Sequence, residues 1–156
     1  RLQKAHQRIR HIRQDFHKKT AHALAQEYGC VYAEDLRVRN MTRSAKGTVE
    51  NPGKNVRQKS GLNRSILRTG FFQFRSTLTW ALAKQGGILM TVAPQYTSQT
   101  CPVCGHCEAG NRRKQAEFRC LRCGYEANAD IVGAINVKEK GRTVPTAHAK
   151  SGSPAQ

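Results

Sequence analysis

The chain has 156 residues and is strongly basic, with 27 Lys and Arg against 10 Asp and Glu, a formal net charge of +17 and an isoelectric point near 10.3. Leu, Ile, Val and Phe number 29, about 19% of the chain, which with so high a charge lies close to the composition of chains that do not fold alone. Apolar runs fall short of the about 18 residues that a membrane helix needs, and nothing resembles a secretory signal, so we expect a cytosolic protein with no membrane partner.

Nucleic acid is the partner that best explains this charge, because an anionic polymer neutralises a self-repelling basic surface. Residues 1–100 hold 18 Lys and Arg against 5 Asp and Glu, whereas residues 101–156 hold 9 against 5. We therefore expect nucleic acid to lie mainly on the first part of the chain; a basic face that is only solvated is the alternative. The sequence begins at Arg1, and we expect it to be a fragment of a longer protein.

The first predicted element is a long amphipathic helix over residues 2–28, with Gly29 as its C-cap. Apolar side chains recur at steps of three, four and seven residues, and they are Leu2, Ile9, Ile12, Phe16, Ala23 and Leu24. Basic residues occupy the other face, from Arg1 to Lys19. Two interpretations of this basic face stay open, a solvated surface and direct contact with phosphates.

The following elements alternate between strand and helix. We predict a short buried strand at 30–34, a basic loop at 37–64, a helix at 63–85 stopped by Gly86 and Gly87, and a second short strand at 88–92. The loop is polar enough to stay disordered until it binds a partner. Two strands are too few for a stable sheet, so we expect the missing strands in sequence upstream of Arg1.

Five of the six cysteines lie between residues 101 and 123, which favours a metal site over disulfides. Cys101, Cys104, Cys120 and Cys123 form a C-x2-C-x15-C-x2-C array. This spacing is typical of a structural zinc site, and the glycine after each second cysteine suits the positive φ of a zinc knuckle. Cys107 offers a shifted alternative for the first pair, and we expect it to be a spectator.

Two acidic residues stand out among the ten. Glu34 ends a predicted strand, where α/β folds often build sites, and Asp130 lies in the first turn of a predicted helix at 129–138, behind a possible N-cap at Asn128. Carboxylates that converge from different elements can hold two divalent ions for phosphodiester hydrolysis. Asp130 could equally compensate the helix dipole, and two acids are an incomplete set.

Several sequence motifs are recognisable together. They are Arg13-Gln14-Asp15-Phe16-His17-Lys18, Glu34-Asp35-Leu36 with Asn40-Met41, Lys59-Ser60-Gly61-Leu62-Asn63-Arg64-Ser65-Ile66-Leu67, Thr97-Ser98-Gln99 before Cys101, and Asn128-Ala129-Asp130 with Gly133-Ala134-Ile135-Asn136-Val137. In this order, over residues 2–139, they resemble the TnpB (OrfB-type) proteins of insertion sequences, compact relatives of type V CRISPR effector nucleases.

This resemblance implies an α/β fold, part of a RuvC-like nuclease domain of the RNase H fold with an inserted four-cysteine zinc ribbon. It implies four segments along the chain: a partial nuclease region at 1–96, the ribbon at 97–126, the last RuvC-like helix at 127–140 and a flexible tail at 141–156. Members of the family are prokaryotic enzymes that cut DNA under the guidance of an RNA. The resemblance therefore implies DNA and guide RNA as partners and the prokaryotic cytoplasm or nucleoid as location.

By the same resemblance, Glu34 and Asp130 match catalytic carboxylates that hold Mg²⁺, and the four cysteines match zinc ligands. Candidate nucleic-acid contacts are Arg64, Arg112, Arg113 and Arg119, with solvated charge as the alternative. The first catalytic Asp of the family has no counterpart in this sequence, and Val132 replaces a common Asn. We therefore expect these 156 residues alone to bind nucleic acid in a salt-sensitive manner without cleaving it. The alternative is a non-catalytic, zinc-dependent nucleic-acid-binding remnant or regulator.

Overall fold

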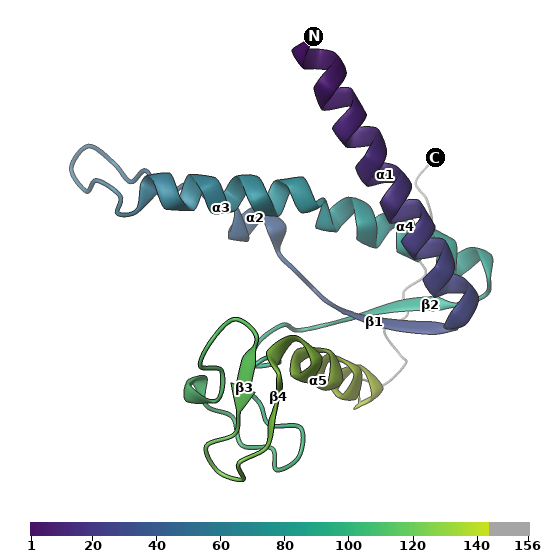
Figure 1. Ribbon diagram of the computed structural model, residues 1–156, viewed down its shortest axis with the longest axis vertical. Coiled ribbons are helices and arrows are strands. Elements are labelled where there is room, and N and C mark those ends of the chain that lie inside the picture. The colour runs from purple at the N-terminus through teal and green to yellow at the C-terminus, as the bar shows by residue number, and fades with distance from the viewer. Residues whose placement is uncertain (144–156) are drawn as a thin grey trace. The chain divides into compact units, whose positions relative to one another are not determined.

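The computed structural model describes residues 1–143 and divides the chain into two compact units (Figure 1). The helical unit comprises residues 1–30 and 36–89, and the ribbon unit comprises residues 31–35 and, within the described part, 90–143. The elements in chain order are α1 (Leu2–Glu27), β1 (Cys30–Glu34), α2 (Val38–Met41), α3 (Val56–Thr69), α4 (Phe71–Lys84), β2 (Ile88–Val92), the 3-10 turn η1 (Ala109–Asn111), β3 (Glu117–Arg119), β4 (Glu126–Asn128) and α5 (Ala129–Thr143).

The two strands predicted at 30–34 and 88–92 are confirmed as β1 and β2, and they pair with each other. The Ile88 N–H donates to the Gly29 carbonyl, and the Asp35 N–H donates to the Val92 carbonyl. Residue numbers rise in the same direction along both strands, so the pairing is parallel. Parallel neighbours need a crossover connection, and helices α2 to α4 provide it. The strand β1 is half-buried along its whole length, which is less than we predicted.

The core of the helical unit forms where α1 packs against α4. Ala21 and Ala25, one turn apart on α1, are buried, as are Leu78 and Leu82 on α4. Small alanine side chains allow two helices to approach closely, so the second half of α1 supplies the contact.

The apolar stripe predicted in the first half of α1 is therefore not part of this core. Leu2, Ile9, Ile12 and Phe16 are 60–75% exposed. Periodicity correctly indicated an amphipathic helix, and α1 forms almost as predicted. Its C-cap prediction was wrong, because Tyr28 caps the helix in extended conformation and its N–H donates to the Leu24 carbonyl.

The single helix predicted at 63–85 is two helices, α3 and α4, which meet at Gly70. Gly70 has φ +71°, a left-handed conformation that interrupts a right-handed helix. The helix α3 also begins seven residues earlier than predicted, at Val56. Much of the predicted basic loop is thus helical, because α2 and the start of α3 both lie within it.

Side chains of α1 hold this interruption. Arg13 Nη1 donates to the carbonyl of Arg68 at 3.0 Å, and His17 Nε2 lies 3.1 Å from the carbonyl of Thr69. The His17 ring is buried and meets Phe74 edge-on, with ring centroids 5.4 Å apart. The last carbonyls of a helix have no hydrogen-bond partner within the helix. Arg13 and His17, one turn apart on α1, provide partners for two such carbonyls at the end of α3.

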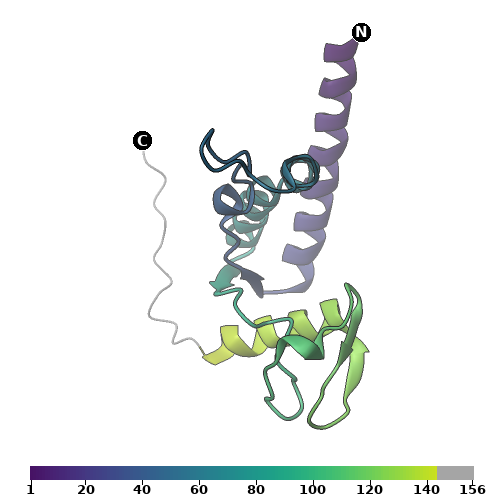
Figure 2. The ribbon, with the colours of Figure 1, turned by 90° about the vertical axis from the view of Figure 1, so that its left-hand side faces the viewer.

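The ribbon unit has its own small core. Strands β3 and β4 pair antiparallel, with Phe118 opposite Ala127. Phe118 and Val132 are buried with Cys101, Cys120 and Ala129 in one cluster. The helix α5 contacts β3 and β4, as Figure 2 shows, and its side chains close one side of this cluster.

The helix α5 begins at Ala129 as predicted but continues to Thr143, five residues beyond the predicted end. The predicted flexible tail therefore starts within a helix, and its remainder, residues 144–156, lies outside the described residues. Within residues 1–143 no helix combines the length and the apolar character needed to cross a membrane.

Candidate functional site

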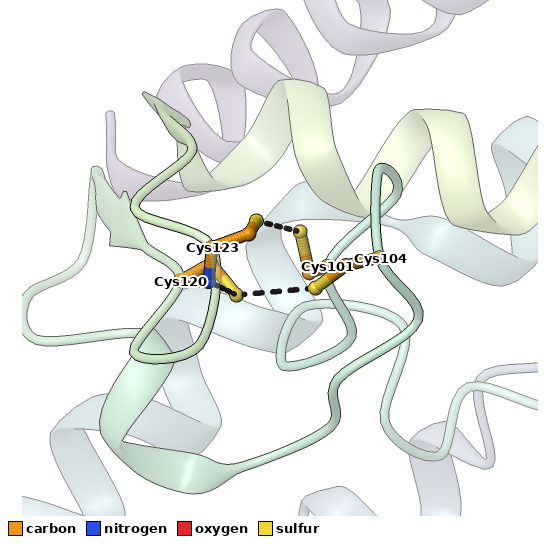
Figure 3. A group of neighbouring side chains, drawn as sticks. All are labelled: Cys101, Cys104, Cys120 and Cys123. Carbon is orange, nitrogen blue, oxygen red and sulfur yellow. Dashed lines mark hydrogen bonds between the residues drawn. The ribbon is translucent and has the colours of Figure 1, made fainter.

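The four cysteines of the predicted zinc array come together in the ribbon unit (Figure 3). Their sulfur atoms all lie within 4.8 Å of one another. The sulfurs of Cys101 and Cys123 are 3.6 Å apart, and those of Cys104 and Cys120 are 3.5 Å apart. Metal–sulfur bonds of about 2.3 Å in a tetrahedron require sulfurs about 3.8 Å apart. The four thiols therefore fit a single tetrahedral ion.

Two turns of the same construction deliver these cysteines. Gly105 and Gly124 have φ of +74° and +76°. The Gly105 N–H donates to the Cys101 carbonyl, and the Gly124 N–H donates to the Cys120 carbonyl, both at 3.0 Å. Glycine adopts this left-handed conformation without strain. The glycine after each C-x2-C pair therefore has the role in the knuckle that the sequence predicted.

The thiols of Cys120 and Cys123 have pKa values shifted in opposite directions. Desolvation raises the pKa of Cys120, but hydrogen bonds from the backbone N–H groups of Cys123 and Arg122 outweigh it, and the pKa falls to about 6. The Tyr125 N–H lowers the pKa of Cys123, yet desolvation and three neighbouring sulfurs raise it to about 12. The cluster thus accepts negative charge at one sulfur and resists it at another. A cation at the centre would stabilise all four thiolates.

Asn111 joins the two knuckles, a role that the sequence did not reveal. Its side chain is fully buried. Its Nδ2 donates to the carbonyls of Gln99 and His106 at 2.9 and 3.1 Å, and its Oδ1 accepts from the Leu121 N–H at 2.9 Å. An asparagine in a polar stretch looks like a turn residue, so no local signal distinguishes it. The side chain fixes the spacing of the two cysteine pairs.

The remaining cysteines lie outside this group. Cys107 is exposed, and Cys30 is half-buried on β1. Neither belongs to the metal-ligating group found in the described part of the chain. The shifted array that would use Cys107 is therefore not formed in this structure.

Glu34 ends β1, as predicted, and its carboxylate is held by a neighbouring hydroxyl. Thr97 Oγ1 donates to Glu34 Oε1 at 2.6 Å. Thr97 is itself buried, and its carbonyl accepts from Asn136 Nδ2 at 2.7 Å. The same amide donates to the carbonyl of Thr100 at 2.7 Å. A continuous set of hydrogen bonds therefore fixes Glu34 relative to α5.

Asp130 lies in the first turn of α5, and its carboxylate is exposed. Asn128 Oδ1 accepts from the Asp130 N–H at 2.8 Å, so the predicted N-cap is confirmed. Arg112 Nη2 lies 3.6 Å from Asp130 Oδ1. Among residues 1–143 the cysteines make up the one group of three or more potential metal ligands. Neither Glu34 nor Asp130 therefore belongs to such a group within these residues.

The predicted nucleic-acid contacts differ in their surroundings. Arg64 lines a cavity of about 710 Å³ together with Lys46 and Arg57. Arg112 contacts Asp130, and Arg119 Nε lies 3.1 Å from Glu126 Oε1. Arg113 is exposed.

The charge itself is divided unevenly between the two units. The helical unit holds 18 Lys and Arg against 3 Asp and Glu, whereas residues 31–35 and 90–156 hold 9 against 7. The sequence predicted that positive charge concentrates in the first part of the chain. The structure assigns almost all of the net charge to one folded unit, the helical unit.

Comparisons with known proteins identify the family. The Probable transposase family (OrfB, IS605 type) matches residues 1–45, and the Cas12f1-like TNB domain matches residues 71–137. InsQ of Escherichia coli K12, whose name describes an RNA-guided DNA endonuclease, is 46% identical over 92% of this chain. The chain belongs to the TnpB (OrfB) family. It spans 36% of the length of InsQ.

A second relative is the CRISPR-associated endodeoxyribonuclease Cas12f1 of Sulfoacidibacillus thermotolerans, which is 52% identical over 48% of this chain and 18% of its own length. Solved structures of similar fold include a Cas12f1–sgRNA–target DNA complex, with a TM-score of 0.58 and 22% identity over 84% of this chain and 34% of that one. The predicted fold class, part of a RuvC-like nuclease domain with a four-cysteine ribbon, is confirmed.

Proposed function

We propose that this chain supplies the ribbon and two catalytic carboxylates of an RNA-guided, Mg²⁺-dependent DNA endonuclease encoded by a mobile element and acting in its transposition. The observation that carries the proposal is the 46% identity to InsQ across 92% of the chain. The carboxylate of Glu34, held by Thr97 at the end of β1, adds a fixed ligand of the required kind.

Zinc is the ion we assign to Cys101, Cys104, Cys120 and Cys123. Thiolate sulfur is a ligand that suits Zn²⁺, and four such ligands form a closed structural site. The sulfur separations of 3.5 and 3.6 Å support this assignment. The buried cluster of the ribbon unit is small, so the ion would supply part of the stability that a larger hydrophobic core gives. It would also hold β3, β4 and the start of α5 together.

Magnesium is the ion we assign to the carboxylates of Glu34 and Asp130, because Mg²⁺ prefers hard oxygen ligands. When bound, two such ions activate water and stabilise the leaving 3′ oxygen of a cut phosphodiester. The resemblance to the family calls for one further catalytic Asp, in a motif that does not occur in this sequence.

The chain's own residues orient these ligands. Thr97 fixes the Glu34 side chain, and Asn128 fixes the start of α5 that carries Asp130. Arg112 balances the charge of Asp130. Guide RNA and DNA would lie on the helical unit, whose 18 basic and 3 acidic residues attract phosphates. Arg64 is the individual contact that we propose on this unit, and Arg112, Arg113 and Arg119 are further contacts that we propose on the ribbon unit.

The test uses the longest open reading frame that contains this sequence, expressed with an RNA transcribed from the end of its element. We expect Mg²⁺-dependent cleavage of a DNA duplex that matches the RNA. Glu34→Gln and Asp130→Asn should each abolish cleavage and leave binding intact. Glu139→Gln is the matched control, because it removes an exposed carboxylate from α5 and should cut normally.

Two results would contradict the proposal. Cleavage that survives in Asp130→Asn would remove this residue from the catalytic set. A protein that binds the guide and its target and never cuts at any Mg²⁺ concentration would favour the alternative of a non-catalytic, zinc-dependent binding protein.

A further inference from the structure

The helical unit contains a groove whose lining includes none of the cysteines and neither Glu34 nor Asp130. Its volume is about 830 Å³, and α1 and α4 form its walls. The residues that matter for its chemistry are Lys18, His22, Ser76, Thr77, Trp80 and Lys84. Its lining includes neither Asp nor Glu. The groove therefore combines positive charge, hydroxyl groups and one large aromatic ring.

Trp80 is the most unusual member of this set. It is 61% exposed, although tryptophan is usually well buried. The ammonium group of Lys84, one turn further along α4, lies 4.1 Å from the centroid of its ring. This cation–π contact holds the indole in place at the groove. An aromatic surface that is fixed and exposed is a platform on which another flat group can stack.

The row of residues that contains Trp80 continues along α4. Phe72, Ser76, Trp80 and Lys84 are spaced four residues apart and so lie along one side of the helix. Phe72 is 70% exposed. Eight residues of helix separate the two aromatic side chains by about 12 Å along the axis. This side of α4 therefore presents two exposed aromatic rings followed by a cation.

We propose that this groove binds single-stranded nucleic acid, with one base stacked on Trp80 and phosphates at Lys18 and Lys84. Base stacking on aromatic rings combined with a basic groove is the usual means by which proteins hold single strands. The inference rests on the proposed function in one respect, that nucleic acid is the partner of the helical unit.

Charge decides between nucleic acid and a protein partner. Two groove residues, Lys18 and Lys84, are positively charged, and the unit around them holds 18 Lys and Arg against 3 Asp and Glu. A phosphate backbone complements this surface along its whole length. Bases in a duplex have both faces covered by their neighbours, so stacking on Trp80 requires a strand with accessible bases.

The test uses intrinsic fluorescence, because Trp80 is the one tryptophan in the 156-residue sequence. The full chain is titrated with oligo(dT), with oligo(rU) and with duplex DNA of the same length. Fluorescence anisotropy of a labelled strand measures binding independently. We expect single strands to quench Trp80 and duplex DNA to quench it far less, and the two single-stranded arms show whether DNA or RNA is preferred.

Variants separate stacking from charge. Trp80→Ala should weaken single-strand binding about 5- to 150-fold, whereas Trp80→Phe should retain most of it. Lys84→Gln should reduce the slope of log affinity against log salt by about 0.7. Lys4→Gln is the matched control, because it removes one positive charge from α1 outside the groove and should leave the quenching of Trp80 unchanged. Circular dichroism checks that Trp80→Ala folds. If Trp80→Ala does not fold, the affinity of Trp80→Phe for single strands is used to judge the stacking role.

Several outcomes would overturn the inference. Single strands that bind with no change in Trp80 emission, and bind Trp80→Ala equally well, would exclude the groove and leave the proposed function standing. Equal quenching by duplex DNA would exclude base stacking. Quenching by poly-glutamate alone would indicate an acidic protein partner. No binding of any nucleic acid would contradict both the groove and the proposed nucleic-acid surface.

Discussion

The hydroxyl of Thr97 donates to the carboxylate of Glu34 across 2.6 Å. The two residues are 63 positions apart in the sequence. Thr97 is 2% exposed, so this contact is protected from water. A short hydrogen bond from a buried donor fixes the orientation of a carboxylate, and groups that orient a metal ligand in this way affect its function strongly.

Loss of this hydroxyl should impair the proposed nuclease without unfolding the protein. We expect Thr97→Val to raise the Mg²⁺ concentration needed for cleavage about 10- to 100-fold, and Thr97→Ser to restore normal behaviour. Cleavage across a Mg²⁺ series, by the protein of the longest open reading frame that contains this sequence, measures this effect. Thr79→Val removes an exposed threonine hydroxyl from α4 and serves as control. Equal Mg²⁺ dependence of Thr97→Val and the unaltered protein would contradict a positioning role for Thr97.

Asn111 should be essential for the stability of the ribbon unit. Asn111→Ala leaves the Leu121 N–H without its partner and removes one of two donors from each of the Gln99 and His106 carbonyls. Each buried group that loses its partner costs about 1–3 kcal/mol. We expect earlier thermal unfolding of the ribbon and weaker metal binding. Gln115→Ala, an exposed change between the same knuckles, should unfold like the original chain, and similar behaviour of the two variants would disprove the bridging role.

Alanine substitutions at Gly70 and Gly61 test the interruption between α3 and α4, with Gly61 as the matched control. Gly70→Ala should destabilise the helical unit by about 1–2 kcal/mol, because its φ of +71° strains any residue with a Cβ. The new Cβ would also lie 3.1 Å from Cε1 of the buried His17. Gly61→Ala, inside α3 with no atom within 4 Å of its new Cβ, should stabilise by about 0.5–1 kcal/mol. Urea unfolding measures both changes, and the same sign for both would refute the argument.

Removal of the metal should unfold the ribbon unit and leave the helical unit less affected. A strong chelator should expose residues 97–128 to protease, because metal binding and folding are coupled in such sites. Cys101→Ser should have the same effect, whereas Cys107→Ser, outside the group, should not. Unchanged protease resistance in the chelator would remove the structural role of the metal.

Metal affinity should rise with pH. The ligands bind as thiolates, and at pH 7 the Cys123 thiol, with a pKa of about 12, is protonated, so binding releases its proton. Each proton released changes the affinity about tenfold per pH unit. Cys120, with its pKa lowered to about 6, is mostly ionised at pH 7 and adds to the dependence as the pH falls toward 6 and below. Competition titrations across this range measure the slope, and an affinity independent of pH would contradict the assignment.

The sequence by itself determined the features that depend on local spacing. The C-x2-C pairs with their following glycines predicted two knuckles, because such turns involve only neighbouring residues, and Asn128 predicted the start of α5 for the same reason. Apolar periodicity predicted α1, and short runs of apolar, β-branched and aromatic residues predicted the two strands. The motifs together identified the family.

Only the tertiary structure decided which residues meet at long range. The stripe of Leu2, Ile9 and Ile12 satisfies helical periodicity and is nonetheless exposed, because close packing on α4 uses Ala21 and Ala25. The break at Gly70 depends on Arg13 and His17, more than 50 residues away. Thr97, Asn111 and Asn136 act through partners brought together by folding. Hydrogen bonds of this kind leave no periodic trace in a sequence, because their geometry arises from the packing of distant segments.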